Sequence, residues 1–254
     1  MIEIRFPDQS ARTYEKGTTA LEIAQSISEG LARNVLSASF NGKTVEAATP
    51  LEEDGNLRLY TWNDQEGKTA FWHSSAHLLA QSILALYPEA KLTIGPAIEN
   101  GFYYDVDFGT ASFSEKDLPL LEKQFLDFAR EKFEFKMRMS SKAEALAFYR
   151  KEQNPFKIEL IENLEDGTIS FCDHANFTDL CRGGHIPHTG FVKAVKLLSV
   201  AGAYWRGDET KPQLTRIYGI SFPKQKELTE YLALLEEAKK RDHMGESNRL
   251  PIHL

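Results

Sequence analysis

The sequence predicts an α+β protein with two units of unequal size and a C-terminal helix. Residues 1–62 hold short strand patterns around one amphipathic helix, and longer helices and strands follow without an internal repeat. The 254 residues are 42% hydrophobic and 26% charged, which is enough apolar material for real cores. We expect the units to span residues 1–62, 63–224 and 225–254.

The first unit has the element order of a β-grasp fold, the fold of ubiquitin. A threonine precedes an apolar stripe at helical spacing, which predicts a capped helix over residues 18–28. Asn41-Gly42 predicts a type I′ hairpin turn because both residues tolerate positive φ. Strands are expected over residues 2–6, 35–40, 43–47 and 56–62. With a second strand between residues 6 and 18, the order is strand, strand, helix and three strands, and no residue set in this unit looks catalytic.

The second unit alternates helices and strands. A helix of about four turns is expected over residues 71–88, where Pro88 stops it. Further helices are expected over residues 114–134, 141–152 and 226–245, and a Ser cap opens the second of them. A Gly turn and an alternating strand are expected over residues 96–108, and strands over residues 167–180 and 213–222. A loop and the segment 192–200 separate the last two strands.

Composition limits the classes of protein. The N-terminus lacks a basic and apolar signal pattern, and no apolar run approaches the ~20 residues of a membrane span. Two cysteines make a disulfide framework improbable and favour the cytoplasm. The net charge of −7 argues against broad nucleic-acid binding, but residues 178–216 carry six Lys/Arg against three acids.

Two spaced pairs form the candidate site. His73 and His77 are four residues apart on the predicted helix, so both rings share one face. Cys181 and His185 have the same spacing about a hundred residues later. The four side chains suit a tetrahedral Zn²⁺, a metal-free catalytic cleft, or a hydrogen-bonded polar core. Ser74 stands where a His-Glu-x-x-His zinc protease has its general base, which excludes that route.

The loop between Cys181 and His185 adds three candidates. Gly183-Gly184 suits positive φ or close approach by a ligand, although an ordinary tight turn is the alternative. Arg182 can contact phosphate in bidentate geometry. Asp179 would share one side of an extended stretch with Cys181 and could bind an ammonium group.

Four blocks together resemble one family. They are "HSSAHLLAQSI", "IGPAIENGFYYDVDF", "FTDLCRGGHIPHTG" and "LLSVAGAYWRGDETKPQLTRIYGISF". They resemble the N-terminal half of bacterial-type threonyl-tRNA synthetases, to about residue 243. By this resemblance residues 1–62 are a TGS domain and residues 63–224 a tRNA editing domain, shared in outline with alanyl-tRNA synthetase editing proteins.

Two residues depart from the family pattern. The family usually has Cys-Arg-Gly-Pro-His, so Gly184 replaces a proline, which should loosen the loop that holds His185. Cys172 has no counterpart in the pattern, and we treat it as structural.

The resemblance implies an ester hydrolase that removes serine from mischarged seryl-tRNA(Thr). It assigns His73 and Lys157 to placing or activating water and polarising the ester. Asp179 would hold the ammonium or hydroxyl of serine. His77, Cys181 and His185 would line the pocket. Tyr104 would be a wall or hydroxyl donor, and Arg182 and Gly183 would contact the tRNA end.

The same resemblance sets cofactors and partners. Editing would need no cofactor, with Zn²⁺ at His73, His77, Cys181 and His185 as the alternative. ATP, Mg²⁺ and a catalytic zinc would belong to an absent ligase core and anticodon-binding domain. The partner would be the acceptor end of tRNA(Thr), bound by a monomeric fragment of a homodimeric parent. A non-catalytic tRNA-docking module and a structural zinc domain are the competing hypotheses.

Overall fold

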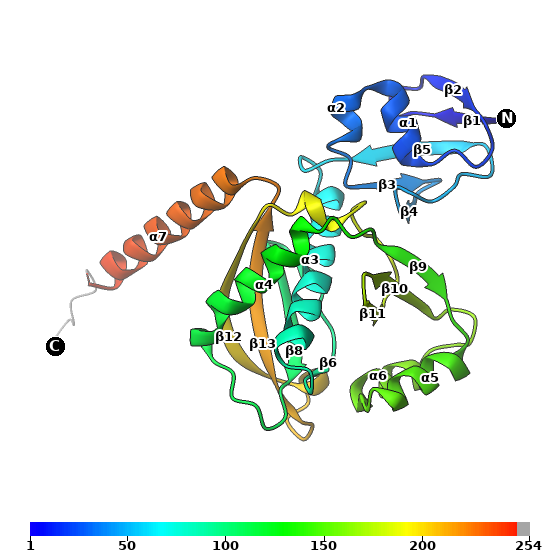
Figure 1. Ribbon diagram of the computed structural model, residues 1–254. Helices are drawn as coiled ribbons and strands as arrows, with labels where there is room; N and C mark the ends of the chain where they lie inside the picture. Colours follow the sequence, from blue (N-terminus) through cyan, green and yellow to red (C-terminus); the bar gives the residue numbers. More distant parts are fainter. Residues whose placement is uncertain (248–254) are drawn as a thin grey trace, which may run out of the picture.

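The computed structural model describes residues 1–247 as two units and a projecting helix (Figure 1). The end of the expected third unit, residues 248–254, lies outside the described residues. The predicted α+β class is confirmed, with a β-grasp sheet first, a larger α+β unit next and a long helix last.

The N-terminal unit is a five-stranded β-grasp sheet in the order β2-β1-β5-β3-β4, with β1 and β5 parallel. Its strands are β1 (Ile2–Arg5), β2 (Ala11–Tyr14), β3 (Ser37–Phe40), β4 (Lys43–Val45) and β5 (Gly55–Tyr60). Its helices are α1 (Ala20–Ile27) and α2 (Glu29–Ala32). A core around Ile4, Ile23 and Leu57 joins the sheet to α1.

Local sequence signals explain the boundaries in this unit. The hydroxyl of Thr19 accepts from the Glu22 N–H, and the Glu22 carboxylate accepts from the Thr19 N–H, so a capping box starts α1. Asn41 and Gly42 have φ of 50° and 76°, as the predicted turn requires. The turn fixes the β3–β4 register and thereby the loop that follows β4.

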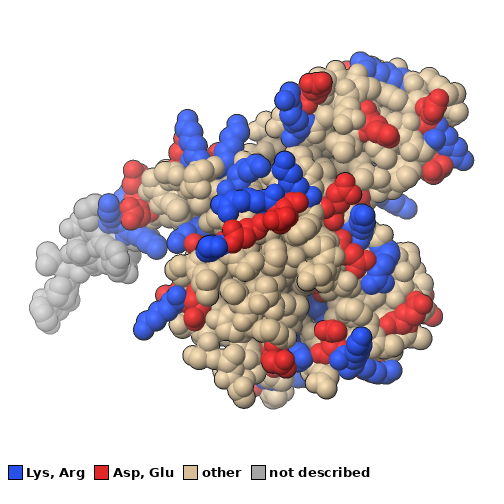
Figure 2. Space-filling view, in the orientation of Figure 1, with Lys and Arg blue, Asp and Glu red and all other residues tan. Residues whose placement is uncertain are grey.

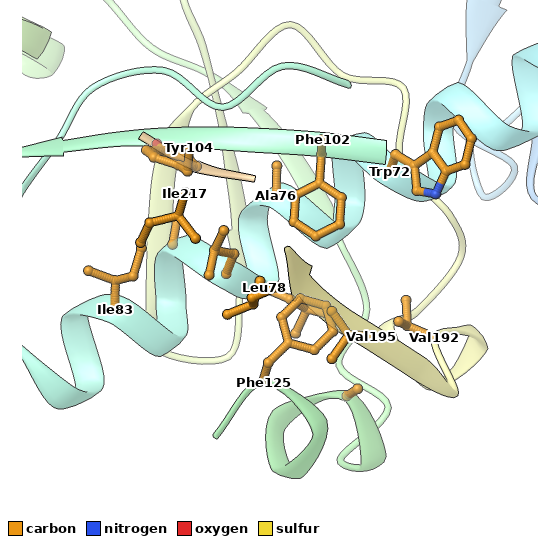
Figure 3. Packing of buried hydrophobic residues seen from close by; sticks show 14 of the residues in the cluster. Trp72, Ala76, Leu78, Ile83, Phe102, Tyr104, Phe125, Val192, Val195 and Ile217 are labelled. Atoms are coloured by element: carbon orange, nitrogen blue, oxygen red, sulfur yellow. The ribbon is translucent and has the colours of Figure 1, made fainter. Parts of the chain in front are cut away.

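The larger unit is built on a sheet in the order β12-β13-β8-β6, and β7 also pairs with β8. The strands are β6 (Lys91–Leu92), β7 (Ala97–Ile98), β8 (Gly101–Asp107), β12 (Ala194–Tyr204) and β13 (Gln213–Phe222). Helices α3 (Gln65–Leu86) and α4 (Leu118–Arg130) pack on this sheet and on each other. Figure 3 shows Leu78, Phe102 and Phe125 meeting in the core between them.

A three-stranded sheet, β11-β10-β9, and two helices form a separate lobe beside this core (Figure 1). The elements are β9 (Lys136–Met139), α5 (Lys142–Lys151), α6 (Pro155–Glu162), β10 (Ser170–His174) and β11 (Phe177–Leu180). Tyr149, Ile161 and Phe171 pack the helices onto this sheet. Ser141 caps α5 as predicted.

Three predicted segments need correction. Helix α3 begins at Gln65 rather than at Phe71. The polar residues 65–70 are also helical, and Asp64 is the N-cap. Residues 167–180 form a hairpin rather than one strand, since Ala175 has a φ of 50° and reverses the chain. The helix over 114–134 is shortened to Leu118–Arg130, after a 3-10 turn at its start.

Helix α7 (Gln225–Ser247) begins next to β13 and projects away from the sheet (Figure 1). None of the helices within residues 1–247 is both long and apolar enough to cross a membrane. Figure 2 shows lysines and arginines near the start of α7 and at the junction with the β-grasp unit, with acidic residues among them. This face is therefore of mixed charge.

Candidate functional site

A cavity of about 840 Å³ opens between the two lobes of the larger unit. Eight of the nine residues predicted for the site line it: His73, His77, Tyr104, Lys157, Asp179, Cys181, Arg182 and Gly183. These residues come from α3, β8, α6 and the end of β11, four segments that are distant in sequence. Apolar walls from Ile94, Pro96 and Leu160 complete the cavity.

Asp179 is the centre of the polar contacts on the cavity wall. Lys157 Nζ lies 2.6 Å from one carboxylate oxygen, and the Tyr104 hydroxyl donates to the other at 2.9 Å. The Tyr149 hydroxyl lies 3.3 Å from Asp179 and His77 Nδ1 lies 3.5 Å from it. The side chains of Lys157 and Asp179 are only 3% and 5% exposed, so they form a buried ion pair.

The start of α6 positions Lys157. The Asn154 side chain accepts from the Lys157 N–H and also donates to the Leu92 carbonyl, so it ties the first turn of α6 to β6. Pro155 occupies the first helical turn, where its missing N–H costs nothing. The cap thus holds the backbone of Lys157 at the start of α6, from where its Nζ reaches Asp179.

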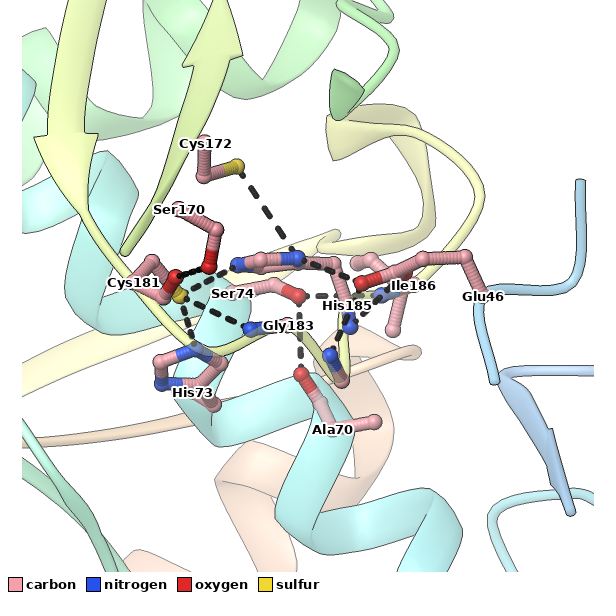
Figure 4. A network of polar contacts seen from close by, with 11 residues as sticks. Glu46, Ala70, His73, Ser74, Ser170, Cys172, Cys181, Gly183, His185 and Ile186 are labelled. Carbon is pink, nitrogen blue, oxygen red and sulfur yellow. Dashed lines mark hydrogen bonds and ion pairs between the residues drawn. The ribbon is translucent and has the colours of Figure 1, made fainter. Parts of the chain in front are cut away.

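His73, His77, Cys181 and His185 form a second group, the His–Cys cluster. One donor atom from each lies within 4.8 Å of the other three. Cys181 Sγ is 3.1 Å from His73 Nε2 and 3.3 Å from His185 Nε2, and it accepts from the Gly183 N–H at 3.3 Å (Figure 4). Neither ring nitrogen of His77 has a hydrogen-bond partner among the described residues.

The cluster shifts the protonation of its members. Burial would raise the pKa of the Cys181 thiol, but the imidazoles of His77, His185 and His73 around the sulfur lower it far below that of an ordinary thiol. Burial would lower the pKa of His185, but contacts with Cys172, Cys181 and Glu46 raise it well above its ordinary value. Burial lowers the pKa of His77. The contacts therefore favour the deprotonated sulfur of Cys181 and the protonated ring of His185.

The His–Cys cluster fits a divalent metal. Tetrahedral zinc with imidazole and thiolate ligands separates its donor atoms by roughly 3.3–3.8 Å. The donor atoms here lie within 4.8 Å of one another, and His77 has two free ring nitrogens among the described residues. Glu46 supports His185 as carboxylates support metal-bound histidines. The cluster could therefore bind a metal, and a hydrogen-bonded metal-free network is equally consistent with its donor set.

The structure corrects one expectation for the 181–185 loop. His185 is fully buried behind Cys181 and does not line the cavity, because its ring is stacked between Phe135 and His73. Gly184, which is expected to loosen the loop, donates its N–H to the Glu46 carboxylate at 2.8 Å. Its φ of 90° is inaccessible to proline, whose ring fixes φ near −65°.

The remaining candidates lie as follows. Arg182 is exposed at the cavity edge, where a ligand could reach it. Cys172 is buried, with its sulfur 3.8 Å from His185 Nδ1. Glu46 and Tyr149 contact site residues and were not predicted. Periodicity did not single out either residue, since Tyr149 fits the core face of α5 and Glu46 lies 139 positions from His185.

Family models match both units. A TGS domain model matches residues 2–61, and a model described as "Threonyl and Alanyl tRNA synthetase second additional domain" matches residues 169–218. The second match contains β10, β11, the 181–185 loop, β12 and the first part of β13. It therefore covers one wall of the cavity.

Threonine–tRNA ligases are similar over nearly the whole chain. Identity is 66% over 243 residues to the one from Flavobacterium johnsoniae and 59% to that from Cytophaga hutchinsonii, in each case over 96% of this chain. The chain spans only 37% and 38% of these relatives' lengths. It is homologous to the N-terminal portion of threonyl-tRNA synthetases, with a TGS domain followed by the second additional domain of the threonyl- and alanyl-tRNA synthetases.

Proposed function

We propose that the cavity hydrolyses the ester of serine mischarged onto tRNA(Thr). The observation that carries the proposal is the convergence of eight predicted residues from four segments on one cavity. A synthetic site gains only about 1–3 kcal/mol from one methyl group, so serine passes a threonine site. A second site that admits serine and clashes with the methyl of threonine removes the error.

The water would be activated by His73. Its ring is the partly exposed member of the His–Cys cluster, and it lines the cavity, whereas His77, Cys181 and His185 are buried. A general base must reach the proton that it removes, and His73 meets this condition from the cavity wall. The Cys181 contact to His73 Nε2 would orient the ring.

Lys157 would polarise the ester. Its Nζ lies 2.6 Å from Asp179 and lines the cavity, where it can donate a hydrogen bond to a bound ester. An ammonium beside the ester carbonyl stabilises the negative charge that develops on the carbonyl oxygen. Asp179 already contacts Lys157, Tyr104 and Tyr149, so the serine ammonium would share a carboxylate that these groups hold in place.

The tRNA end would enter past Arg182. This exposed guanidinium at the cavity edge suits a phosphate of the acceptor strand. Gly183, with a φ of 98°, lets the backbone approach the terminal ribose closely. The partner would be the acceptor end of tRNA(Thr) in the cytoplasm, and the ligase core would be a separate part of the same enzyme.

The proposed hydrolysis needs no metal. His73, His77, Cys181 and His185 would hold Zn²⁺ if it binds, and a bound zinc lowers the pKa of a water molecule. The role given to Lys157 does not depend on the metal, whereas a zinc-bound His73 could not act as the general base, because its ring would have no free lone pair. Removal of metal from the protein therefore tests the assignment separately.

Deacylation assays test the proposal. The full chain, incubated with Ser-tRNA(Thr) and Thr-tRNA(Thr) in parallel, should release serine and leave the threonyl ester intact. His73→Ala should abolish serine release without unfolding the protein. His188→Asn is the control, since His188 caps a short helix away from the cavity lining and asparagine is also a capping residue. Salt-sensitive tRNA binding without release would refute the proposal and support a docking module.

A further inference from the structure

The β-grasp domain contributes one side chain to the neighbourhood of the cavity. Glu46 follows β4, and its side chain is 18% exposed. Its carboxylate accepts from the Gly184 N–H at 2.8 Å and from the His185 N–H at 3.0 Å. His185 Nδ1 lies 3.0 Å from the same carboxylate (Figure 4). One carboxylate thus binds the backbone and the ring of the same residue across the domain boundary.

These three contacts fix the orientation of His185. With Nδ1 toward Glu46, Nε2 lies toward Cys181 Sγ at 3.3 Å, and Cys181 in turn contacts His73 at 3.1 Å. Catalytic histidines are held in place in a similar way: a carboxylate orients the imidazole, and the imidazole contacts a third group. The series Glu46, His185, Cys181 and His73 runs from the β-grasp domain to the cavity wall.

The loop conformation makes Glu46 necessary for this arrangement. Gly183 and Gly184 both have positive φ, at 98° and 90°. Two consecutive glycines have high conformational freedom, so the loop gains little rigidity from its own backbone. Glu46 accepts the N–H groups of Gly184 and His185, and Ser74 accepts the Ile186 N–H at 3.0 Å. Glu46 is the part of this support that comes from the other domain.

We propose that Glu46 is a positioning residue for the cavity, through which the β-grasp domain completes the hydrolytic site. The inference rests on the proposed editing function, and it gives the TGS domain a role in that function. Glu46 does not reach the cavity itself. It acts through His185 and Cys181 on the ring of His73.

The chemistry of the three contacts selects the variants. Glutamine at position 46 keeps the shape but has one acceptor oxygen, and its amide group would face an N–H donor. Glu46→Gln therefore loses at least one of the three hydrogen bonds. Glu46→Asp keeps the charge and both oxygens on a side chain shorter by one methylene, and it should restore part of the loss. Glu53→Gln is the matched control, an exposed carboxylate in the same domain.

Two readouts on the full chain test the proposal. Amide hydrogen exchange, followed by NMR, reports on the N–H groups of Gly184 and His185 without any substrate. Glu46→Gln should accelerate their exchange about 10–100-fold, the range expected for a hydrogen bond to a charged group. Deacylation of Ser-tRNA(Thr) should lose a similar factor in kcat while KM changes less than about twofold. Glu46→Asp should fall between Glu46→Gln and the parent in both readouts.

The outcomes separate this inference from the proposed function. Exchange that is as slow in Glu46→Gln as in Glu53→Gln would overturn the proposal, as would fast exchange with unchanged kcat. If the unmodified protein releases no serine, the proposed function is wrong, and Glu46 has no positioning role in catalysis. The hydrogen-exchange result still decides whether Glu46 holds the loop. Should Glu46→Gln not fold, Glu46→Asp carries the same comparison.

Discussion

The buried pair of Lys157 and Asp179 gives the sharpest prediction for stability. The two charged groups lie 2.6 Å apart, with side chains 3% and 5% exposed, so water screens both charges only weakly. Lys157→Met keeps a long unbranched side chain of similar volume but removes the cation. The carboxylate of Asp179 is then left buried with the hydroxyls of Tyr104 and Tyr149 as donors and His77 Nδ1 at 3.5 Å.

The size of the effect follows from that environment. Removing one partner of a buried ion pair costs about 3–5 kcal/mol because the other charge stays uncompensated. Two tyrosine hydroxyls still donate to Asp179, which places the expected loss near the lower limit, at about 3 kcal/mol. Asp179→Asn should cost a similar amount by leaving Lys157 without an anion. The double variant should cost less than the sum, with a coupling energy above about 1 kcal/mol.

Urea unfolding measures this free energy. Tryptophan fluorescence is a suitable signal because Trp205 packs against Phe156, next to Lys157. Lys151→Met is the control, since Lys151 is exposed on α5 and should change stability by less than about 0.5 kcal/mol. A loss below about 1 kcal/mol for Lys157→Met, or additive single variants, would refute the buried ion pair.

Three further predictions concern acid, metal and the loop. Burial lowers the pKa of His174 to about 3, so this histidine takes up a proton at a higher pH in the unfolded chain than in the folded protein. The free energy of unfolding should therefore decrease as the pH is lowered from 6.5 to 3, by at most about 1.4 kcal/mol per pH unit. His174→Asn should flatten urea midpoints over this range, and an unchanged slope would contradict it. Serine release should survive dialysis against a chelator; loss with recovery on added Zn²⁺ would assign water activation to a metal. Gly184→Ala should cost about 1 kcal/mol by strain at positive φ, and Gly184→Pro more, because proline also lacks the N–H that Glu46 accepts. Equal urea midpoints for the two Gly184 variants would mean that the loop has another conformation.

Local patterns predicted most of the fold. The Thr19 and Ser141 caps and the Asn41-Gly42 turn act within a few residues, so sequence alone locates them. Residues 65–70 lack apolar periodicity, and their helix was missed because it extends a longer helix rather than burying a face of its own. The hairpin at Ala175 was missed because alanine seldom adopts positive φ.

The site was predictable as two pairs, but its supporting contacts were not. The spacing of His73 and His77 on one helix fixes their common face, and the structure brings them to Cys181 and His185. Tyr149 and Glu46 carry no such pattern. Their roles depend on how a helix and a whole domain pack against the cavity, which is tertiary information.

The charges of the buried groups explain why a carboxylate, that of Glu46, contacts His185. Two buried pairs lie in the interior: Lys157 with Asp179, and His185 with Cys181, where the contacts lower the pKa of the thiol and raise that of the imidazole. A raised pKa favours the cationic form of His185 at a fully buried position, and Cys181 contacts only its Nε2, so Nδ1 needs an acceptor of its own. The carboxylate of Glu46 meets that requirement from outside the domain. A change at Glu46 should therefore affect Cys181 and His73 more than the β-grasp core, from which its carboxylate is directed away.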